Sequence, residues 1–167
     1  VESIKKSLEK TKQQRLYGLL FHDPEIVKSR QFQSLVWRLQ DTDLVSKIGI
    51  SGYNEVDILR AKEKCDELSL FQVPENILDR RLRESTGLQE IALSGSEIHV
   101  RSVFLQGMLL MDPYKIKGIL KPWESAINEL NKFASSLGVS VIDICISYVK
   151  SLKWSSGTVI AASSASN

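Results

Sequence analysis

The stretch SKIGISGYNEVDILRAKEKCDELSLFQVP, residues 46–74, predicts a strand, a helix and a second strand in succession. Its two outer runs are short and apolar, and the first strand is expected over Ser46–Ile50. The segment between them, residues 54–68, has apolar side chains at helical spacing, with Asn54 as the expected N-cap. Two strands joined by such a helix are normally parallel, with a right-handed crossover. The positions expected to face the core are Val56, Leu59, Cys65 and Leu68.

The same alternation of strand and helix extends through the whole chain of 167 residues. Further strands are expected at residues 16–21, 97–104 and 157–163, and further helices within residues 1–14, 29–44, 80–96, 121–138 and 140–152. The strands are apolar runs without in/out alternation, which is typical of a parallel sheet covered on both faces. We therefore predict an α/β fold with five parallel strands and intervening helices, in a single domain over residues 1–167.

Composition narrows the classes of function. Hydrophobic residues make up 43% of the sequence and charged residues 25%, as in globular domains, and the net charge is +2. So small a charge does not favour a nucleic-acid partner or a membrane surface. No apolar run approaches the ~20 residues of a membrane helix, and the first residues show no signal-peptide pattern. Cys65 and Cys145 lie in helix-like apolar patterns, so we expect buried thiols and a cytoplasmic location rather than a disulfide or a metal pair.

Polar side chains follow every expected strand, at the end where ligands bind in parallel α/β folds. Because these side chains share one edge of the sheet, they predict a ligand site. Most are neutral amides and hydroxyls, which suit an amide-bearing or polyhydroxy ligand but supply no nucleophile. The sequence has no glycine-rich phosphate loop, zinc-ligand cluster or nucleophile elbow. The polar residues are His22, Asp23, Ser51, Asn54, Gln72, Glu75, Asn76, Arg101, Ser102, Ser163 and Ser164.

Four motifs occur in order along the chain: GLLFHDP, KIGISGYNEVDIL, LFQVPENILDRRL and EIHVRSVFLQGMLLMDP. Together they resemble the second part of an aldo-keto reductase, and the resemblance covers essentially all 167 residues. It implies a partial (β/α)8 TIM barrel, from strand four to strand eight, and NADPH-dependent reduction of aldehyde or ketone carbonyls. The HVRSVFLQG variant resembles a subgroup associated with sugar metabolism, so a sugar-derived carbonyl substrate is expected.

The resemblance implies roles for individual rim residues. His22 matches the catalytic histidine, which orients the substrate carbonyl or stabilises its developing negative charge. Ser51 and Gln72 match residues that hydrogen-bond the nicotinamide carboxamide, and Ser102 matches a residue near the cofactor's pyrophosphate. His99 has no such match and lies mid-strand, where a packed, neutral imidazole is expected.

Other positions either depart from the family pattern or lie further along the chain. Arg101 stands where many members place an aromatic ring against the nicotinamide, and we expect its guanidinium to stack there instead. Gly52 stands where asparagine is common, so one carboxamide contact is expected to be missing. Ser163 and Ser164 begin the loop expected to hold the adenosine end of NADPH, and Trp123, after the long loop, is expected to contact the substrate.

The general acid of the family is a tyrosine, and that tyrosine lies on strands that this sequence does not include. Tyr17, Tyr53, Tyr114 and Tyr148 do not lie in the required motif. We therefore expect a fragment that is nearly inactive alone, because a positioned acid contributes ~10²–10⁴-fold. Open, apolar sheet edges at residues 16–21 and 157–163 predict self-association. The alternatives are a non-catalytic nucleotide-binding or scaffold half-barrel, and an unrelated, doubly wound open sheet.

Overall fold

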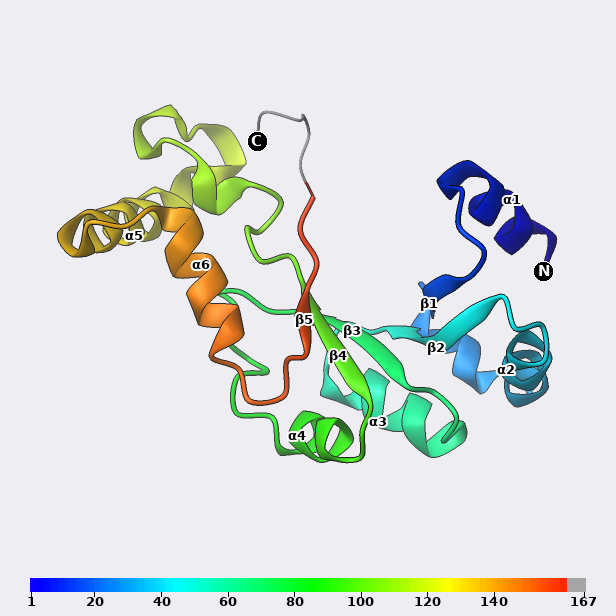
Figure 1. Ribbon diagram of the computed structural model, residues 1–167. Coiled ribbons are helices and arrows are strands. Elements are labelled where there is room, and N and C mark those ends of the chain that lie inside the picture. The colour runs from blue at the N-terminus through cyan, green and yellow to red at the C-terminus, as the bar shows by residue number, and fades with distance from the viewer. Residues whose placement is uncertain (162–167) are drawn as a thin grey trace.

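The computed structural model describes residues 1–161, in which helices alternate with strands (Figure 1). The strands are β1 (Leu16–Phe21), β2 (Val45–Ser51), β3 (Leu70–Pro74), β4 (Glu97–Arg101) and β5 (Gly157–Thr158). The α-helices are α1 (Glu2–Thr11), α2 (Phe32–Gln40), α3 (Glu55–Lys64), α4 (Thr86–Leu93), α5 (Glu124–Leu137) and α6 (Val141–Lys150). Four short 3-10 helices are η1 (Pro24–Lys28), η2 (Met108–Leu110), η3 (Pro113–Lys115) and η4 (Gly118–Trp123).

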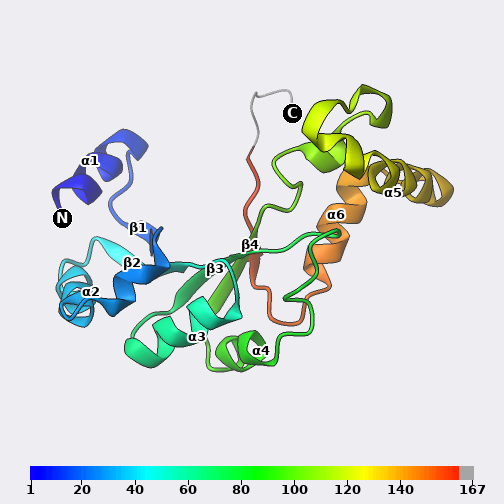
Figure 2. The same ribbon diagram turned by 180° about the vertical axis from the view of Figure 1, so that it is seen from behind.

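The strands form one sheet in the order β1-β2-β3-β4-β5, and every pairing is parallel. Both ribbon views place α2, α3 and α4 along one side of this sheet, with α6 beside β5 and α5 beyond α6 (Figures 1 and 2). The spatial order follows the chain without reversal, as in a barrel wall. The predicted α/β fold with five parallel strands is confirmed, and the doubly wound alternative is wrong because that arrangement needs a switch in strand order.

Helix boundaries follow local sequence signals. The Asn54 side chain accepts a hydrogen bond from the amide of Asp57 at 2.9 Å, so it caps α3 as predicted. Ser140 and Asp143 form a capping box at the start of α6, and Gly138 ends α5 with φ of 67°. Within the described residues no single helix has the length and hydropathy of a membrane span. Residues 118–137 and 141–150 meet both criteria only as a pair, across a bend of 91°.

The predicted core face of α3 is partly wrong. Val56 and Leu59 are 56% and 38% exposed, whereas Ile58 and Ala61 are fully buried. The cause lies in the preceding turn, where the backbone of Gly52 packs on Ile58: a Cβ on Gly52 would lie 2.8 Å from the Ile58 Cδ1 atom. This contact directs the Ile58 side of the helix toward the sheet.

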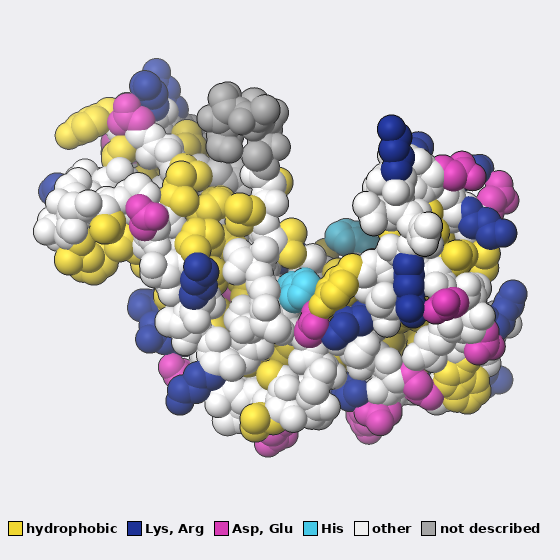
Figure 3. All heavy atoms as spheres, in the orientation of Figure 1, with side chains coloured by type: hydrophobic (Ala, Val, Ile, Leu, Met, Phe, Trp, Pro, Cys, Tyr) yellow, Lys and Arg dark blue, Asp and Glu magenta, His cyan; other side chains and the backbone are white. Residues whose placement is uncertain are grey.

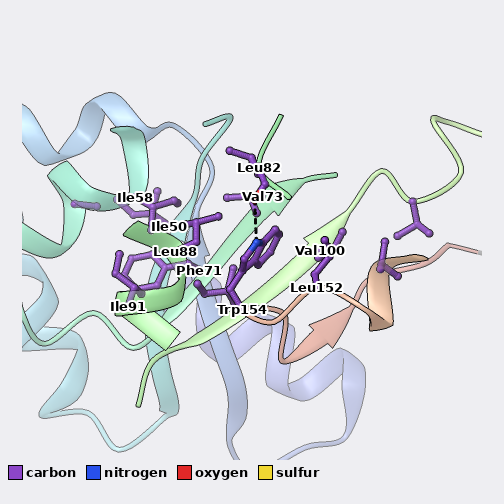
Figure 4. Close-up of a cluster of buried hydrophobic side chains, with 14 of the residues drawn as sticks. Ile50, Ile58, Phe71, Val73, Leu82, Leu88, Ile91, Val100, Leu152 and Trp154 are labelled. Carbon is purple, nitrogen blue, oxygen red and sulfur yellow. Dashed lines mark hydrogen bonds between the residues drawn. The ribbon is translucent and has the colours of Figure 1, made fainter. Parts of the chain in front are cut away.

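The main core lies between the sheet and the helices that cover it (Figure 4). Trp154 is buried among side chains from β3, β4, α4 and the chain before α4, and its indole nitrogen donates a hydrogen bond to the carbonyl oxygen of Leu82 at 2.9 Å. Cys65 and Cys145 are free and buried, as predicted, and desolvation is the main cause that raises the pKa of each thiol to about 11.

The two faces of the sheet differ, contrary to the prediction that both are covered. The outer face, under the helices, carries the fully or almost fully buried side chains Ile48, Ile50, Phe71, Val73, Ile98 and Val100. The inner face carries Lys47, Gly49, Ser51, Leu70, Gln72, Glu97, His99 and Arg101, which are matched across the strands by register. Several of these are charged and only half-buried, and the space-filling view is deeply hollowed on one side of the molecule (Figure 3).

Two glycines let the inner face curl tightly. A Cβ on Gly49 would lie 1.3 Å from the backbone oxygen of Leu70, so no side chain fits between β2 and β3 there. A Cβ on Gly18 would lie 2.3 Å from the Leu70 Cδ2 atom, so the leucine side chain reaches β1 across β2. The paired glycines bring β1 and β3 together over β2, which is the curvature that a barrel wall requires.

The edges of the sheet are the sides of β1 and β5. Among residues 1–161, β1 pairs only with β2, and β5 pairs only with β4. The last predicted strand is shorter than expected, because regular pairing covers only Gly157–Thr158 of residues 157–161, and the rest of the predicted strand lies outside the described residues. Self-association through these edges stays a prediction, and the molecular mass in solution tests it.

A buried carboxyl fixes the segment that follows β3. Glu75 is fully buried, accepts a hydrogen bond from the Tyr148 hydroxyl at 2.6 Å, and accepts another from the Leu82 amide at 3.1 Å. Desolvation raises the pKa of Glu75 above its ordinary value, against the lowering effect of these two donors. A raised folded-state pKa means that the charged form is the costly one, so this site favours the fold at low pH and loses that contribution as the pH rises through the folded pKa.

Tyr148→Phe removes one of the two hydrogen-bond donors that stabilise the buried carboxylate of Glu75. We expect the free energy of unfolding to fall by about 1–3 kcal/mol at pH 8 and by less at pH 5, where Glu75 is closer to neutral. Urea unfolding at both pH values measures the difference. Tyr114→Phe is the matched control, because Tyr114 is 88% exposed. An equal loss at the two pH values would show that the hydroxyl does not act through the charge of Glu75.

Candidate active site

The register of the sheet brings two predicted ligand residues together at the carboxyl end of the strands. Ser51, at the end of β2, is paired with Gln72 in β3. The Ser51 hydroxyl is buried and donates a hydrogen bond to the Gln72 Oε1 atom at 3.4 Å. This bond orients the carboxamide of Gln72, so its amide group remains available as a donor on the inner face.

Arg101 links the ends of β4 and β2 across this rim. Its Nη2 donates to the carbonyl oxygen of Gly52 at 3.2 Å, and its Nη1 donates to the Ser102 hydroxyl at 3.4 Å. The guanidinium lies over the ring of Tyr53, 5.0 Å from the centroid. The structure therefore brings Ser51, Gln72, Arg101 and Ser102 to one rim, as the sequence predicted.

A strained turn follows Arg101. Ser102, Leu105 and Gln106 have φ values of 60°, 47° and 54°, in the left-handed region that costs roughly 1–2 kcal/mol per non-glycine residue. Asn76 supports the turn by donating from its side-chain nitrogen to the carbonyl oxygen of Ser102 at 3.3 Å. Within residues 1–161, the amides of Val103, Phe104 and Gln106 donate to no backbone oxygen. Backbone strain of this kind often accompanies a ligand-binding loop.

His22 lies on the same rim but makes fewer contacts. Phe21 of β1 is paired with Ile50 of β2. His22 follows Phe21 and Ser51 follows Ile50, so the two residues lie at the same level of the sheet. The side chain of His22 is exposed and makes no hydrogen bond to another residue in the described part of the chain. The neighbouring Asp23 accepts a hydrogen bond from the Glu25 amide at 2.9 Å and caps a 3-10 helix, so its carboxylate holds the turn after β1. The imidazole of His22 is therefore free to contact a ligand.

The sequence reasoning missed a second polar cluster on the inner face, nearer the amino ends of the strands. Glu97 lies 2.7 Å from the Lys47 ammonium and 3.3 Å from His99 Nε2, and it also accepts the hydroxyl proton of Tyr17. The hydrogen bond from Lys47 and then that from Tyr17 lower the pKa of Glu97. His99 is therefore partly buried beside a carboxylate, and its predicted neutral form stays a prediction. The alternation Glu97–Ile98–His99–Val100–Arg101 was the signal for a polar inner face.

Three predicted site residues are not brought to the rim by the described contacts. Trp123 ends η4 and is 45% exposed, and within residues 1–161 it makes no hydrogen bond to the rim residues. Ser163 and Ser164 lie outside the described residues. A substrate role for Trp123 and an adenosine role for the two serines stay predictions.

The sequence matches one protein family over its whole length. The family model described as "Aldo/keto reductase family" matches residues 1–167. No curated protein matches the sequence.

Solved structures show the same fold at low sequence identity. An aldo-keto reductase from Bacillus halodurans, in its apo form, is 19% identical with a TM-score of 0.75, over 98% of this chain and 57% of that one. A glycerol dehydrogenase from Gluconobacter oxydans is 17% identical with a TM-score of 0.66, over 94% and 53%. A thermostable aldo-keto reductase bound to the inhibitor epalrestat is 18% identical with a TM-score of 0.69, over 96% and 55%. The chain thus spans little more than half the length of each, and the predicted partial barrel is confirmed.

Proposed function

The chain belongs to the aldo/keto reductase family, and from this premise we propose that it forms the nicotinamide-binding rim of an NADPH-dependent oxidoreductase. The reaction is the reduction of an aldehyde or ketone carbonyl. The observation that carries the proposal is the pairing of Ser51 with Gln72 at adjacent strand ends, with a hydrogen bond of 3.4 Å between them. Together they offer a carboxamide both a donor and an acceptor.

The residues present fit such a cofactor. Gln72 and Ser51 would hold the nicotinamide carboxamide. The strained turn after Ser102, with three amides that donate to no backbone oxygen within the described residues, would receive the pyrophosphate. When bound, NADPH would supply the hydride that reduces the carbonyl carbon. The half-buried rim excludes part of the surrounding water, which strengthens each of these polar contacts.

His22 acts at the carbonyl oxygen in this proposal. Its exposed imidazole, level with Ser51 on the neighbouring strand, would donate a hydrogen bond to the oxygen as negative charge develops there. No tyrosine in residues 1–161 supplies the proton. The hydroxyls of Tyr17 and Tyr148 donate to Glu97 and Glu75, and the ring of Tyr53 packs under Arg101. We therefore propose that a polypeptide limited to these 167 residues is nearly inactive.

The test uses protein expressed from the complete gene. We expect it to oxidise NADPH in the presence of 4-nitrobenzaldehyde, followed by the loss of absorbance at 340 nm. Gln72→Ala should weaken NADPH binding by about 2- to 10-fold, the effect of one hydrogen bond, in a fluorescence titration. Gln89→Ala, on α4, is the matched control. Binding without any turnover would favour a non-catalytic nucleotide-binding protein, and neither binding nor turnover would refute the proposed function.

A further inference from the structure

The guanidinium of Arg101 carries a charge that no carboxylate of the described chain neutralises. Its three partners are all neutral: the Gly52 carbonyl oxygen, the Ser102 hydroxyl and the Tyr53 ring. The other basic residue of the inner face, Lys47, is in contrast paired with Glu97 at 2.7 Å. The side chain of Arg101 is partly buried, and no carboxylate among residues 1–161 competes with an incoming anion for its guanidinium.

The hydrogen-bonding capacity of the same group is also unfilled. A guanidinium has five N–H groups, and the described contacts of Arg101 use one from Nη1 and one from Nη2. Its Nε is buried and has no partner, and it is the only buried side-chain nitrogen or oxygen in residues 1–161 of which this is true. Buried donors without acceptors are rare in folded proteins, because they lose their hydrogen bonds to water and gain nothing in return.

The position of the guanidinium is held from two strands. Gly52 and Tyr53 hold it from the end of β2, and Ser102 holds it from the end of β4. Tyr53 is itself fixed, because its amide donates to the Asp57 carboxylate at 2.7 Å. A planar fork held in this way is matched to a carboxylate or a phosphate, which can accept two parallel N–H bonds.

The guanidinium of Arg101 also lies closer to the mouth of the rim than Ser51 and Gln72 do. Arg101 is paired with Pro74, two residues beyond Gln72 along β3, so it lies further toward the mouth of the rim than the Ser51–Gln72 pair. A group bound there would belong to a molecule that enters from the mouth while its reactive part contacts the Gln72 level.

We propose that Arg101 binds an anionic group, a carboxylate or a phosphate, on the carbonyl substrate, so that the enzyme prefers acidic aldehydes or ketones over neutral ones of the same shape. The inference rests on the proposed function of this rim. The same chemistry could come from a phosphate of the cofactor, and the experiment separates these two sources.

The test compares aldehydes that differ in charge but little in shape. With protein from the complete gene, kcat/KM is measured for 2-, 3- and 4-carboxybenzaldehyde and for the corresponding nitrobenzaldehydes. We expect at least one carboxy isomer to be preferred over its nitro counterpart by tenfold or more. Arg101→Met should abolish that preference by raising KM for the carboxy compounds more than for the nitro compounds, and Arg101→Lys should keep part of it.

Arg81→Met is the matched control, because the Arg81 guanidinium pairs with Asp79 at 3.1 Å and makes no contact with Arg101 or its partners. It should leave both substrate series unchanged. An equal loss for charged and neutral aldehydes in Arg101→Met would show that Arg101 only supports the rim, and would overturn the proposal. So would an absence of preference in the unmodified protein. A matching loss of NADPH affinity, measured by fluorescence, would assign the anion to the cofactor and equally overturn it.

A binding measurement separates failure of this inference from failure of the proposed function. Titration calorimetry with benzoate should show binding to the unmodified protein and at least tenfold weaker binding to Arg101→Met. If no aldehyde is reduced, the proposed function fails, and benzoate binding that depends on Arg101 still supports an anion site. If benzoate binds equally to both proteins or to neither, the anion site is refuted whether or not aldehydes are reduced.

Discussion

We expect His22→Ala to lower kcat for 4-nitrobenzaldehyde by about 10²- to 10³-fold in the protein expressed from the complete gene, the usual effect of removing one positioned hydrogen-bond donor. The physical reason is the loss of the one imidazole at the rim, which follows β1 at the level of Ser51 and has no hydrogen-bond partner elsewhere in the described chain. Without it, the developing negative charge on the carbonyl oxygen loses a positioned donor. Steady-state kinetics give kcat, and fluorescence titration should give an unchanged affinity for NADPH.

The second histidine is a natural control, because the sequence has only two. His99 lies on the same face of the sheet, but its Nε2 is 3.3 Å from the Glu97 carboxylate, in the cluster nearer the amino ends of the strands. His99→Gln should leave kcat within about threefold of its original value, a change in barrier of about RT, because the imidazole of His99 contacts Glu97 rather than the rim. A His22→Ala protein that keeps its full rate would remove His22 from the catalytic machinery.

The second large effect concerns the fold itself. Gly49→Ala should lower the free energy of unfolding by about 3 kcal/mol or more, at the upper end of overpacking costs. The added Cβ would lie 1.3 Å from the carbonyl oxygen of Leu70, and backbone cannot move aside as a side chain can. Urea unfolding followed by circular dichroism measures the loss.

Gly18→Ala provides the comparison at the next strand. Its added Cβ meets only the Cδ2 methyl group of Leu70, at 2.3 Å, so a smaller loss of about 1–2 kcal/mol is expected. In double-mutant cycles, Leu70→Val should offset part of the cost of Gly18→Ala and none of the cost of Gly49→Ala. Equal coupling of Leu70→Val to both glycine variants would mean that side-chain crowding, rather than the backbone contact, explains the cost at Gly49.

Local signals in the sequence predict where most helices and strands lie and which polar residues end at the rim. The apolar run 16–21 coincides with β1, the Asn54 cap is where the sequence places it, and α6 lies within the predicted range 140–152. The polar residues after β2, β3 and β4 meet because a parallel sheet puts all its carboxyl ends on one edge. Once the two strands are predicted correctly, Ser51 and Gln72 follow as neighbours, because each stands near the carboxyl end of its strand.

What could not be predicted depends on contacts between distant segments. Arg101 bonds to Gly52, 49 residues away in sequence, and no local pattern shows that its guanidinium lies over Tyr53. The core face of α3 is ambiguous in the sequence, because Ile58 and Ala61 continue the helical spacing of Cys65 and Leu68 as well as Val56 and Leu59 do, and the packing of Ile58 on the Gly52 backbone accompanies the observed choice. The sequence predicts that both faces are covered, because Ile98 and Val100 make β4 look like an apolar run. The residues between and beside them, Glu97, His99 and Arg101, are polar and lie on the inner face.

The bonds that anchor the chain after β3 come from far along the sequence. Glu75 takes its hydroxyl donor from Tyr148, and the carbonyl of Leu82 takes its indole donor from Trp154. During synthesis on the ribosome, both partners emerge more than sixty residues after the groups they satisfy. The newborn polypeptide must therefore keep the Glu75 carboxyl hydrated until Tyr148 has left the exit tunnel, and this loop can adopt its final structure only after residues 148–154 have been translated.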